Sequence, residues 1–242
     1  MTQGKNPRSF KKKGSKKRQH HPFSKKVWYT VQAPSAFQTR EACLTPVNKT
    51  SGRHKESSSL KGRVFDISLA DLNQDAPEMS WRKIQLQVAG VEGQKAYTLF
   101  HGMSMTKDRL CHIVKKWQTT IETFVNVKTR DGYFLRVFAV GFTARRKTQL
   151  SATSYATNCQ IGKIRKKMRD IMTEEIRGSL LKQVSSKFIE RGIEKRIGTE
   201  CNKIFPLQNI YLKKCKMLKQ PKLPFAKLMD MYSDKAGAAR VD

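Results

Sequence analysis

Apolar and polar residues alternate over several short stretches in the first half of the chain. The clearest stretch is 83–88, where Ile84, Leu86 and Val88 alternate with lysine and glutamine. A period of two is typical of a strand with one buried face. The polar segment 51–59 has no apolar anchor and predicts an exposed loop. The alternation, together with the density of strand-forming residues, predicts strands at 27–31, 64–69, 83–88 and 97–100.

A helical period begins near Thr106, which we expect to cap the start of a helix. Apolar residues then recur at helical spacing, at Leu110, Ile113, Val114, Trp117, Ile121 and Phe124. Such a stripe is typical of a helix that packs on a core, although it can also bind a partner. We therefore predict that Trp117 is a buried core residue and not a platform on which a nucleobase stacks.

The pair Asp131-Gly132 lies between two strand-forming segments, 124–130 and 133–140. This pair is typical of a two-residue hairpin turn in which both residues have positive φ. The second segment is apolar on both faces. It therefore predicts a central strand that is covered on both sides.

Helical periodicity dominates the chain after residue 157. It predicts helices at 158–177, 180–188, 193–204 and 225–232, with a last strand opening at 210. Because antiparallel strands accompany a separate cluster of helices, we expect an α+β fold and not a doubly wound sheet. The chain is expected to divide into a basic arm at 1–21, a single domain at 22–229 and a frayed tail at 230–242.

The charge of the chain indicates which kind of partner it binds. Lysine and arginine total 49 residues against 19 aspartate and glutamate residues, which gives a formal net charge of +30. A charge of this size opposes compaction unless a polyanion neutralises it. Nucleic acid is the expected polyanion, because the chain has no run of about 18 apolar residues for a membrane span. We also find no signal-peptide or lipidation motif, and we predict no membrane partner.

Basic residues are concentrated in the first 26 positions, and no acidic residue occurs before Glu41. Such a segment cannot bury a core, so we expect 1–21 to be disordered until phosphate groups organise it. It also fits a nuclear import signal, and a solvating tail without a specific partner is the alternative. The candidate RNA-binding residues here are Lys11, Lys12, Lys13, Lys16, Lys17, Arg18, Lys25 and Lys26.

A second basic segment follows the predicted central strand and carries Arg145, Arg146 and Lys147. Arginine can clamp a phosphate through two hydrogen bonds, whereas lysine acts as a point charge. Tyr155 follows this segment and can stack on an unpaired base, or it can anchor the loop as a half-buried residue. The first half of the predicted helix at 158–177 adds the candidates Lys163, Arg165, Lys166 and Lys167.

Residues that could carry enzymatic chemistry are sparse. The five cysteines are odd in number and form no C-x-x-C pair, so we predict reduced, structural cysteines and no zinc site. The motifs of phosphate loops, dinucleotide folds, serine hydrolases and zinc proteases do not occur. We therefore predict a non-enzymatic protein without a cofactor. An enzyme that acts on RNA through residues distant in sequence is the third hypothesis.

Eight short segments occur in the order in which a known family carries them. They are PFSKKVWY at 22–29, LKGRVFDISLADL at 60–72, FHGM at 100–103, VKKWQ at 114–118, VKTRDGY at 127–133, TSYA at 153–156, IRKKM at 164–168 and KMLKQPK at 216–222. In these segments the chain resembles the eukaryotic and archaeal family of small-subunit ribosomal proteins called S-three-a, or eS-one. The chain departs from the family in its serine-rich loop at 51–59 and at 150–152, where the family usually carries more basic residues.

The resemblance implies a β-barrel-like core flanked by helices, and a structural role on the platform of the small ribosomal subunit near the exit of the mRNA channel. It implies contacts with ribosomal RNA and neighbouring ribosomal proteins, and proximity to mRNA and translation initiation factors. On this basis we expect cytoplasmic ribosomes as the site of action, with nuclear and nucleolar passage during assembly. The alternative is a regulatory RNA- or DNA-binding module outside the ribosome.

Overall fold

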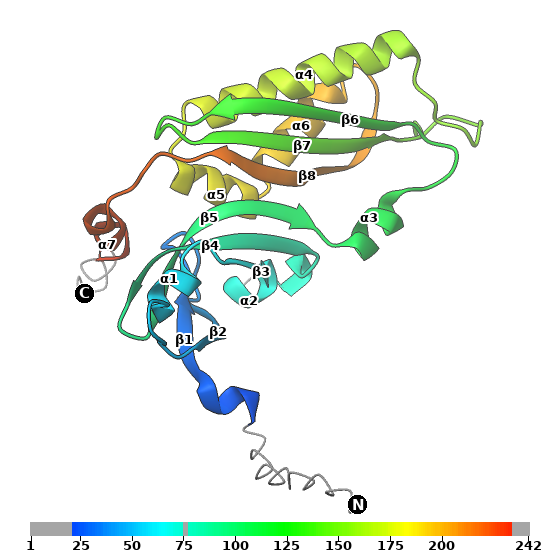
Figure 1. The fold of residues 1–242 in the computed structure, drawn as a ribbon. Coiled ribbons are helices and arrows are strands. Elements are labelled where there is room, and N and C mark those ends of the chain that lie inside the picture. The colour runs from blue at the N-terminus through cyan, green and yellow to red at the C-terminus, as the bar shows by residue number, and fades with distance from the viewer. Residues whose placement is uncertain (1–20, 75–76, 234–242) are drawn as a thin grey trace, which may run out of the picture.

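A computed structural model of the chain describes residues 21–74 and 77–233 (Figure 1). The predicted basic arm, except for its last residue, and most of the predicted tail lie outside the described residues. The candidate RNA-binding residues between Lys11 and Arg18 are among those outside. Their expected disorder and RNA contacts stay predictions.

Within the described residues, eight strands form one mixed sheet in the order β2-β1-β5-β8-β7-β6, with β4 paired to β5 and β3 paired to β4. The strands are β1 (Lys26–Gln32), β2 (Glu41–Asn48), β3 (Val64–Ser68), β4 (Arg82–Glu92), β5 (Lys95–Met105), β6 (Thr120–Lys128), β7 (Phe134–Thr143) and β8 (Leu207–Lys219). All pairs are antiparallel except β1 with β5. The sheet is twisted and unclosed (Figure 1). The predicted α+β class is confirmed.

Helices cover one face of the β6–β7–β8 part of the sheet. The described helices of the whole chain are α1 (Glu56–Leu60), α2 (Leu69–Leu72), α3 (Lys107–Ile113), α4 (Asn158–Arg177), α5 (Leu181–Ile189), α6 (Gly192–Cys201) and α7 (Phe225–Ser233). Those on this face are α4, α5 and α6. The long helix α4 contacts β6 and α6, and α6 contacts β8 (Figure 1). The helices predicted in the second half of the chain are therefore confirmed, within a few residues of their expected bounds.

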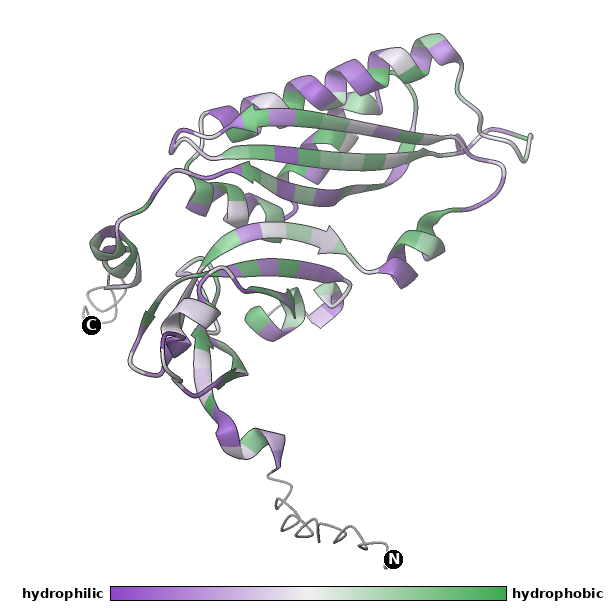
Figure 2. Cartoon of the chain, viewed as in Figure 1, coloured by the Kyte–Doolittle hydropathy of each residue, from purple (hydrophilic) through white to green (hydrophobic). Residues whose placement is uncertain are grey.

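The main core lies between these helices and the sheet. Ile164, Met168 and Ile171 recur at helical spacing on α4 and are buried, as are Val125 and Leu135 on the strands beneath them. Buried and more exposed positions alternate along much of β6 and along the first half of β7, and Figure 2 shows hydrophilic and hydrophobic residues interspersed along β6. The helical period of α4 and the strand period of β6 therefore both place their apolar residues at this interface.

The predicted strands of the first half are all present, but two features differ from expectation. Strand β2 was not predicted. It contains Pro46 and pairs only with β1, and such an edge position tolerates proline. The predicted loop at 51–59 is wrong in its second half, which forms the start of α1. There the Glu56 carboxylate accepts hydrogen bonds from the Tyr29 hydroxyl at 2.6 Å and the Thr50 N–H at 2.8 Å, and Leu60 is buried.

The helix predicted from Thr106 onwards is too long. Helix α3 ends at Ile113, and the residues from Thr120 onwards belong to β6. The apolar residues Ile121 and Phe124, which fitted the helical stripe, lie on opposite faces of this strand, one buried and the other exposed. Pairing of β6 with β7 along its full length satisfies the backbone and outweighs the helical period.

The β6–β7 hairpin is confirmed, but its turn is not the predicted two-residue type. The loop spans 129–133, and only Gly132 has a positive φ, of +87°. The Gly132 N–H donates to the Thr129 carbonyl at 3.0 Å, and the Thr129 N–H donates to the Tyr133 carbonyl at 2.8 Å. Strand β7 is central, as predicted, between β6 and β8. The prediction that both of its faces are covered is wrong for its first half, where Arg136 and Phe138 are partly exposed.

A buried ion pair joins strand β4 to helix α6. Arg82 of β4 is fully buried, and its guanidinium lies 2.6 Å from the Glu194 carboxylate of α6. It also donates to the Phe188 carbonyl. Glu194 in turn accepts from the Arg191 guanidinium at 2.5 Å and from the Leu212 N–H of β8 at 2.9 Å. Burial lowers the pKa of Arg82, and the Glu194 charge opposes that shift. One carboxylate thus connects β4, α6 and β8.

Candidate nucleic-acid interface

The basic loop after β7 is fixed to the end of the sheet at its start, and the Ser154 N–H ties its far end to the Trp117 carbonyl at 2.9 Å. The Thr143 N–H donates to the Thr119 carbonyl at 3.1 Å, and the Ala144 N–H donates to the Pro206 carbonyl at 2.8 Å. Within the loop, the Gln149 side chain accepts from the Arg146 N–H at 3.4 Å and donates to the Thr153 carbonyl. The loop is therefore presented by a rigid scaffold.

Arg145, Arg146 and Lys147 are all exposed on this loop. The Arg145 guanidinium donates to the Gln149 carbonyl at 3.2 Å. The structure gives the side chains of Arg146 and Lys147 no hydrogen bond or ion pair with the described residues. In the sequence, no acidic residue lies between Asp131 and Asp170 to neutralise these charges. The three side chains are thus available to an external anion.

Two aromatic side chains flank this basic loop. Tyr155 and Trp117 are each 59% exposed, so neither is a buried anchor. Their segments are joined by Ser154, whose N–H donates to the Trp117 carbonyl at 2.9 Å. The prediction that Trp117 belongs to the core is wrong: it lies in the connection between α3 and β6, with a positive φ of 67°. The signal in the sequence was the Lys115-Lys116 pair directly before it, which suits a surface segment.

Helix α4 begins at Asn158, three residues after Tyr155, and extends this surface. Lys163, Arg165 and Lys166 are exposed, because the buried face of α4 is taken by its apolar residues. Lys167 differs, since its ammonium lies 2.6 Å from the Glu200 carboxylate of α6. That hydrogen bond raises the pKa of Lys167. The fold therefore already compensates the charge of one of the four predicted cations.

The remaining described candidates lie far along the chain from this surface. Lys25 ends a short 3-10 helix (Pro22–Lys25) and is exposed. Lys26 opens β1, and its ammonium donates to the Asn48 amide oxygen at 2.9 Å. We call the surface formed by residues 114–118, 144–156 and the first half of α4 the loop-end surface. Lys25 and Lys26 lie where the 3-10 helix meets the start of β1, and they do not belong to the loop-end surface.

Comparison with protein-family models decides the family. The model described as the ribosomal S3Ae family matches residues 14–221. The chain belongs to the ribosomal S3Ae family. Membership gives it a structural role in the small ribosomal subunit, associated with ribosomal RNA and other ribosomal proteins. The resemblance seen in the short sequence segments is confirmed, and the loop-end surface lies within the matched region.

Acidic side chains of this S3Ae protein gather around the second half of α4. The Arg196 guanidinium of α6 forms ion pairs with Glu174, Glu175 and Glu200 at 2.7, 2.6 and 3.0 Å. The hydrogen bond from Lys167 is the largest cause of the lowered pKa of Glu200. Each of these carboxylates forms an ion pair with a cation of the protein itself. Of the three, Glu200 reaches the edge of the loop-end surface, where it neutralises Lys167. The exposed cations Arg145, Arg146 and Lys147 of that surface form no ion pair within the described residues.

The described cysteines of the S3Ae chain are all free. Burial raises the pKa of Cys215 to about 12 and that of Cys201 to about 11, so both thiols are protonated and unreactive near neutral pH. The structural interpretation is wrong for Cys111 and Cys159, which are exposed.

In the described part of the chain, no three histidine, cysteine, aspartate or glutamate side chains are arranged to hold a metal ion. None of the described helices has the length and apolar character of a membrane span.

Two substitutions test whether the Trp117 side chain lies on the surface. Trp117→Ala is expected to change the free energy of unfolding by less than about 1 kcal/mol, as for other surface substitutions. Trp117→Gly should be at least as stable as Trp117→Ala, because glycine adopts a positive φ without steric cost. Urea unfolding of both variants checks this. A loss of about 3–5 kcal/mol would instead indicate a core cavity.

Proposed function

We propose that this S3Ae protein binds ribosomal RNA on the platform of the small subunit, near the exit of the mRNA channel, and supports translation there. The observation that carries the proposal is the loop-end surface, where Arg145, Arg146 and Lys147 are exposed on the loop that leads to Tyr155, and where the rings of Tyr155 and Trp117 are exposed as well. Neighbouring small-subunit proteins are its expected protein contacts. We further propose proximity to mRNA and initiation factors, and nucleolar passage during assembly.

Two physical arguments support RNA as the ligand of the loop-end surface. Cations that lack internal partners gain from releasing counterions when they approach phosphates. Exposed aromatic rings stack on unpaired bases, which folded RNA offers in its loops and bulges. Cations also occur on several sides of the protein and not in one tail only, as suits a protein surrounded by folded RNA.

Co-sedimentation tests the proposal. The full-length chain, carrying an affinity tag, is expected to remain with small ribosomal subunits through a high-salt wash. Ultraviolet crosslinking of those subunits should join peptides containing Trp117 or Tyr155 to ribosomal RNA. Release of the chain by the wash, with crosslinks to other RNA or to DNA, would favour a regulatory module outside the ribosome.

A further inference from the structure

The opposite face of the β6–β7–β8 sheet is partly uncovered. Helices α4, α5 and α6 all lie on one face of these strands (Figure 1). On the other face, only the second half of β7 is covered, where Val140 and Phe142 pack with Tyr211 and Ile113. The first half of β7 and the facing parts of β6 and β8 have no described layer over them.

Two phenylalanine rings stand on this uncovered face. Phe124 of β6 and Phe138 of β7 are directly paired across the strands. Their ring centroids are 5.9 Å apart, with an interplanar angle of 38°, and Phe124 is 55% exposed. A cross-strand aromatic pair stabilises a sheet only modestly. Covering these rings would remove apolar surface from water, which is favourable, so the face can gain free energy by binding a ligand.

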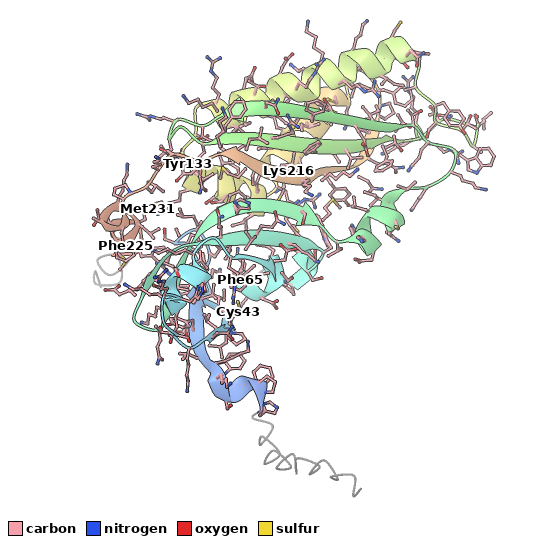
Figure 3. The ribbon with its side chains drawn as sticks, in the orientation of Figure 1. Cys43, Phe65, Tyr133, Lys216, Phe225 and Met231 are labelled. Atoms are coloured by element: carbon pink, nitrogen blue, oxygen red, sulfur yellow. The ribbon has the colours of Figure 1, made fainter. Side chains whose placement is uncertain are left out.

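Cations surround the two rings. The Arg136 guanidinium carbon lies 5.6 Å from the Phe124 ring centroid, and the Lys216 ammonium lies 5.9 Å from that of Phe138. Arg136 is oriented by donating to the Asn126 amide oxygen at 2.7 Å. Lys214 is the β8 partner of Phe138. Figure 3 labels Lys216 on β8, in the middle of this part of the sheet.

The charge of this face is mostly uncompensated. Glu122 of β6 pairs with Lys213 of β8 at 3.0 Å. The structure gives Lys214 and Lys216 no ion pair within the described residues. The two rings and these side chains line a depression of about 370 Å³. It therefore combines an aromatic floor with a cationic border.

We propose that this face is a stacking site for unpaired nucleotides of single-stranded RNA. Bases would stack on Phe124 and Phe138, and the phosphates would contact Arg136, Lys214 and Lys216. The inference rests on the proposed RNA-binding function, but it concerns a surface separate from the loop-end surface. It adds a second contact with its own ligand class.

The chemistry of the site favours a single strand over other partners. A base in a duplex is stacked on its neighbours and cannot present its face to a ring. The centre of a protein–protein interface is typically depleted of lysine, whereas lysine and arginine border the rings here. An exposed sheet with aromatic residues and cations is a known solution for binding unpaired bases, as in RRM domains.

The test compares ring removal with a matched control. The full-length variant Phe124→Leu/Phe138→Leu keeps apolar side chains but loses both aromatic faces. Phe225→Leu removes an exposed phenylalanine from α7, and Phe225 is 46% exposed. Affinity is measured for a labelled single-stranded oligouridine and for an RNA duplex of equal length. We expect the double variant to bind the single strand about 5- to 100-fold more weakly, with duplex affinity and melting temperature unchanged. The control should match the unmodified protein.

Two results would overturn the inference. One is unchanged affinity for the single strand in a folded double variant. The other is crosslinking of Lys214 and Lys216 to a protein instead of RNA in assembled subunits. If the double variant fails to fold, Lys214→Gln/Lys216→Gln replaces it. The slope of its log affinity against log salt should fall by roughly 0.7 for each phosphate that is no longer bound, and an unchanged slope would reject the site. Failure of the unmodified chain to bind any RNA would instead reject the proposed function.

Discussion

Glu194→Ala is expected to destabilise the fold by about 3–5 kcal/mol, because it leaves the buried Arg82 charge without its partner. Arg82 is 0% exposed and Glu194 is 3% exposed, so water cannot replace the missing carboxylate. The change also removes the acceptor of the Leu212 N–H. Urea unfolding monitored by tryptophan fluorescence measures the effect.

Two further variants separate the buried charge from the loss of side-chain volume. Arg82→Met/Glu194→Leu removes both charges and is expected to recover part of the stability that Glu194→Ala loses, since an apolar pair of similar volume has no desolvation penalty. Glu200→Ala breaks ion pairs in which the Glu200 side chain is 24% exposed, and it should cost less than about 1 kcal/mol. A Glu194→Ala cost as small as that of Glu200→Ala would show that the buried pair does not hold the fold together.

Replacing Arg145, Arg146 and Lys147 with glutamine is expected to weaken RNA binding while leaving the fold intact. On a single-stranded or irregular fragment of small-subunit RNA, the slope of log affinity against log salt should fall by about two units if all three contact phosphates. The free energy of unfolding should change by less than roughly 1 kcal/mol, because the three side chains are exposed. Affinity across a salt series, with parallel thermal melting, measures both quantities.

A matched control has the same change of charge at another place. Lys49, Arg53 and Lys55 are exposed near β2 and α1, and their replacement by glutamine should leave the salt slope closer to that of the unmodified protein. Equal slopes in both triple variants would mean that only the total charge matters. An unchanged slope in the loop variant would move the RNA surface to Arg165 and Lys166 on α4. A collapsed melting temperature would show that the loop is structural.

The over-long helix predicted from Thr106 and the wrong prediction of a buried Trp117 have the same cause. Ile121 and Phe124 satisfy a helical period and a strand period over a short window, and a short window cannot separate the two. What decides is the availability of a pairing partner, which β7 supplies along the whole of β6. Once Thr120 starts a strand, Trp117 is left in the connection and becomes exposed.

For the candidate RNA-binding residues too, the sequence predicted local properties but not contacts between distant elements. The sequence correctly indicated that Arg145, Arg146 and Lys147 would lie in an exposed loop, because charge and loop composition are local properties. It left open whether Tyr155 would be exposed or half-buried. It could not show that Lys167 is paired with Glu200, since the partner is on another helix. The uncovered face with Phe124 and Phe138 was equally invisible, because which face of a strand is covered depends on where the helices pack.

By itself, the sequence determined the excess of positive charge, the amphipathic helices of the second half, the β6–β7 hairpin and the family. These follow from composition, from periods within one element and from short collinear motifs. Only the tertiary structure decided which aromatic rings stay in water, which cations keep their charge unpaired, and how Arg82 and Glu194 meet across 112 positions of the chain. Those outcomes depend on contacts between elements distant in sequence, and no local pattern encodes them.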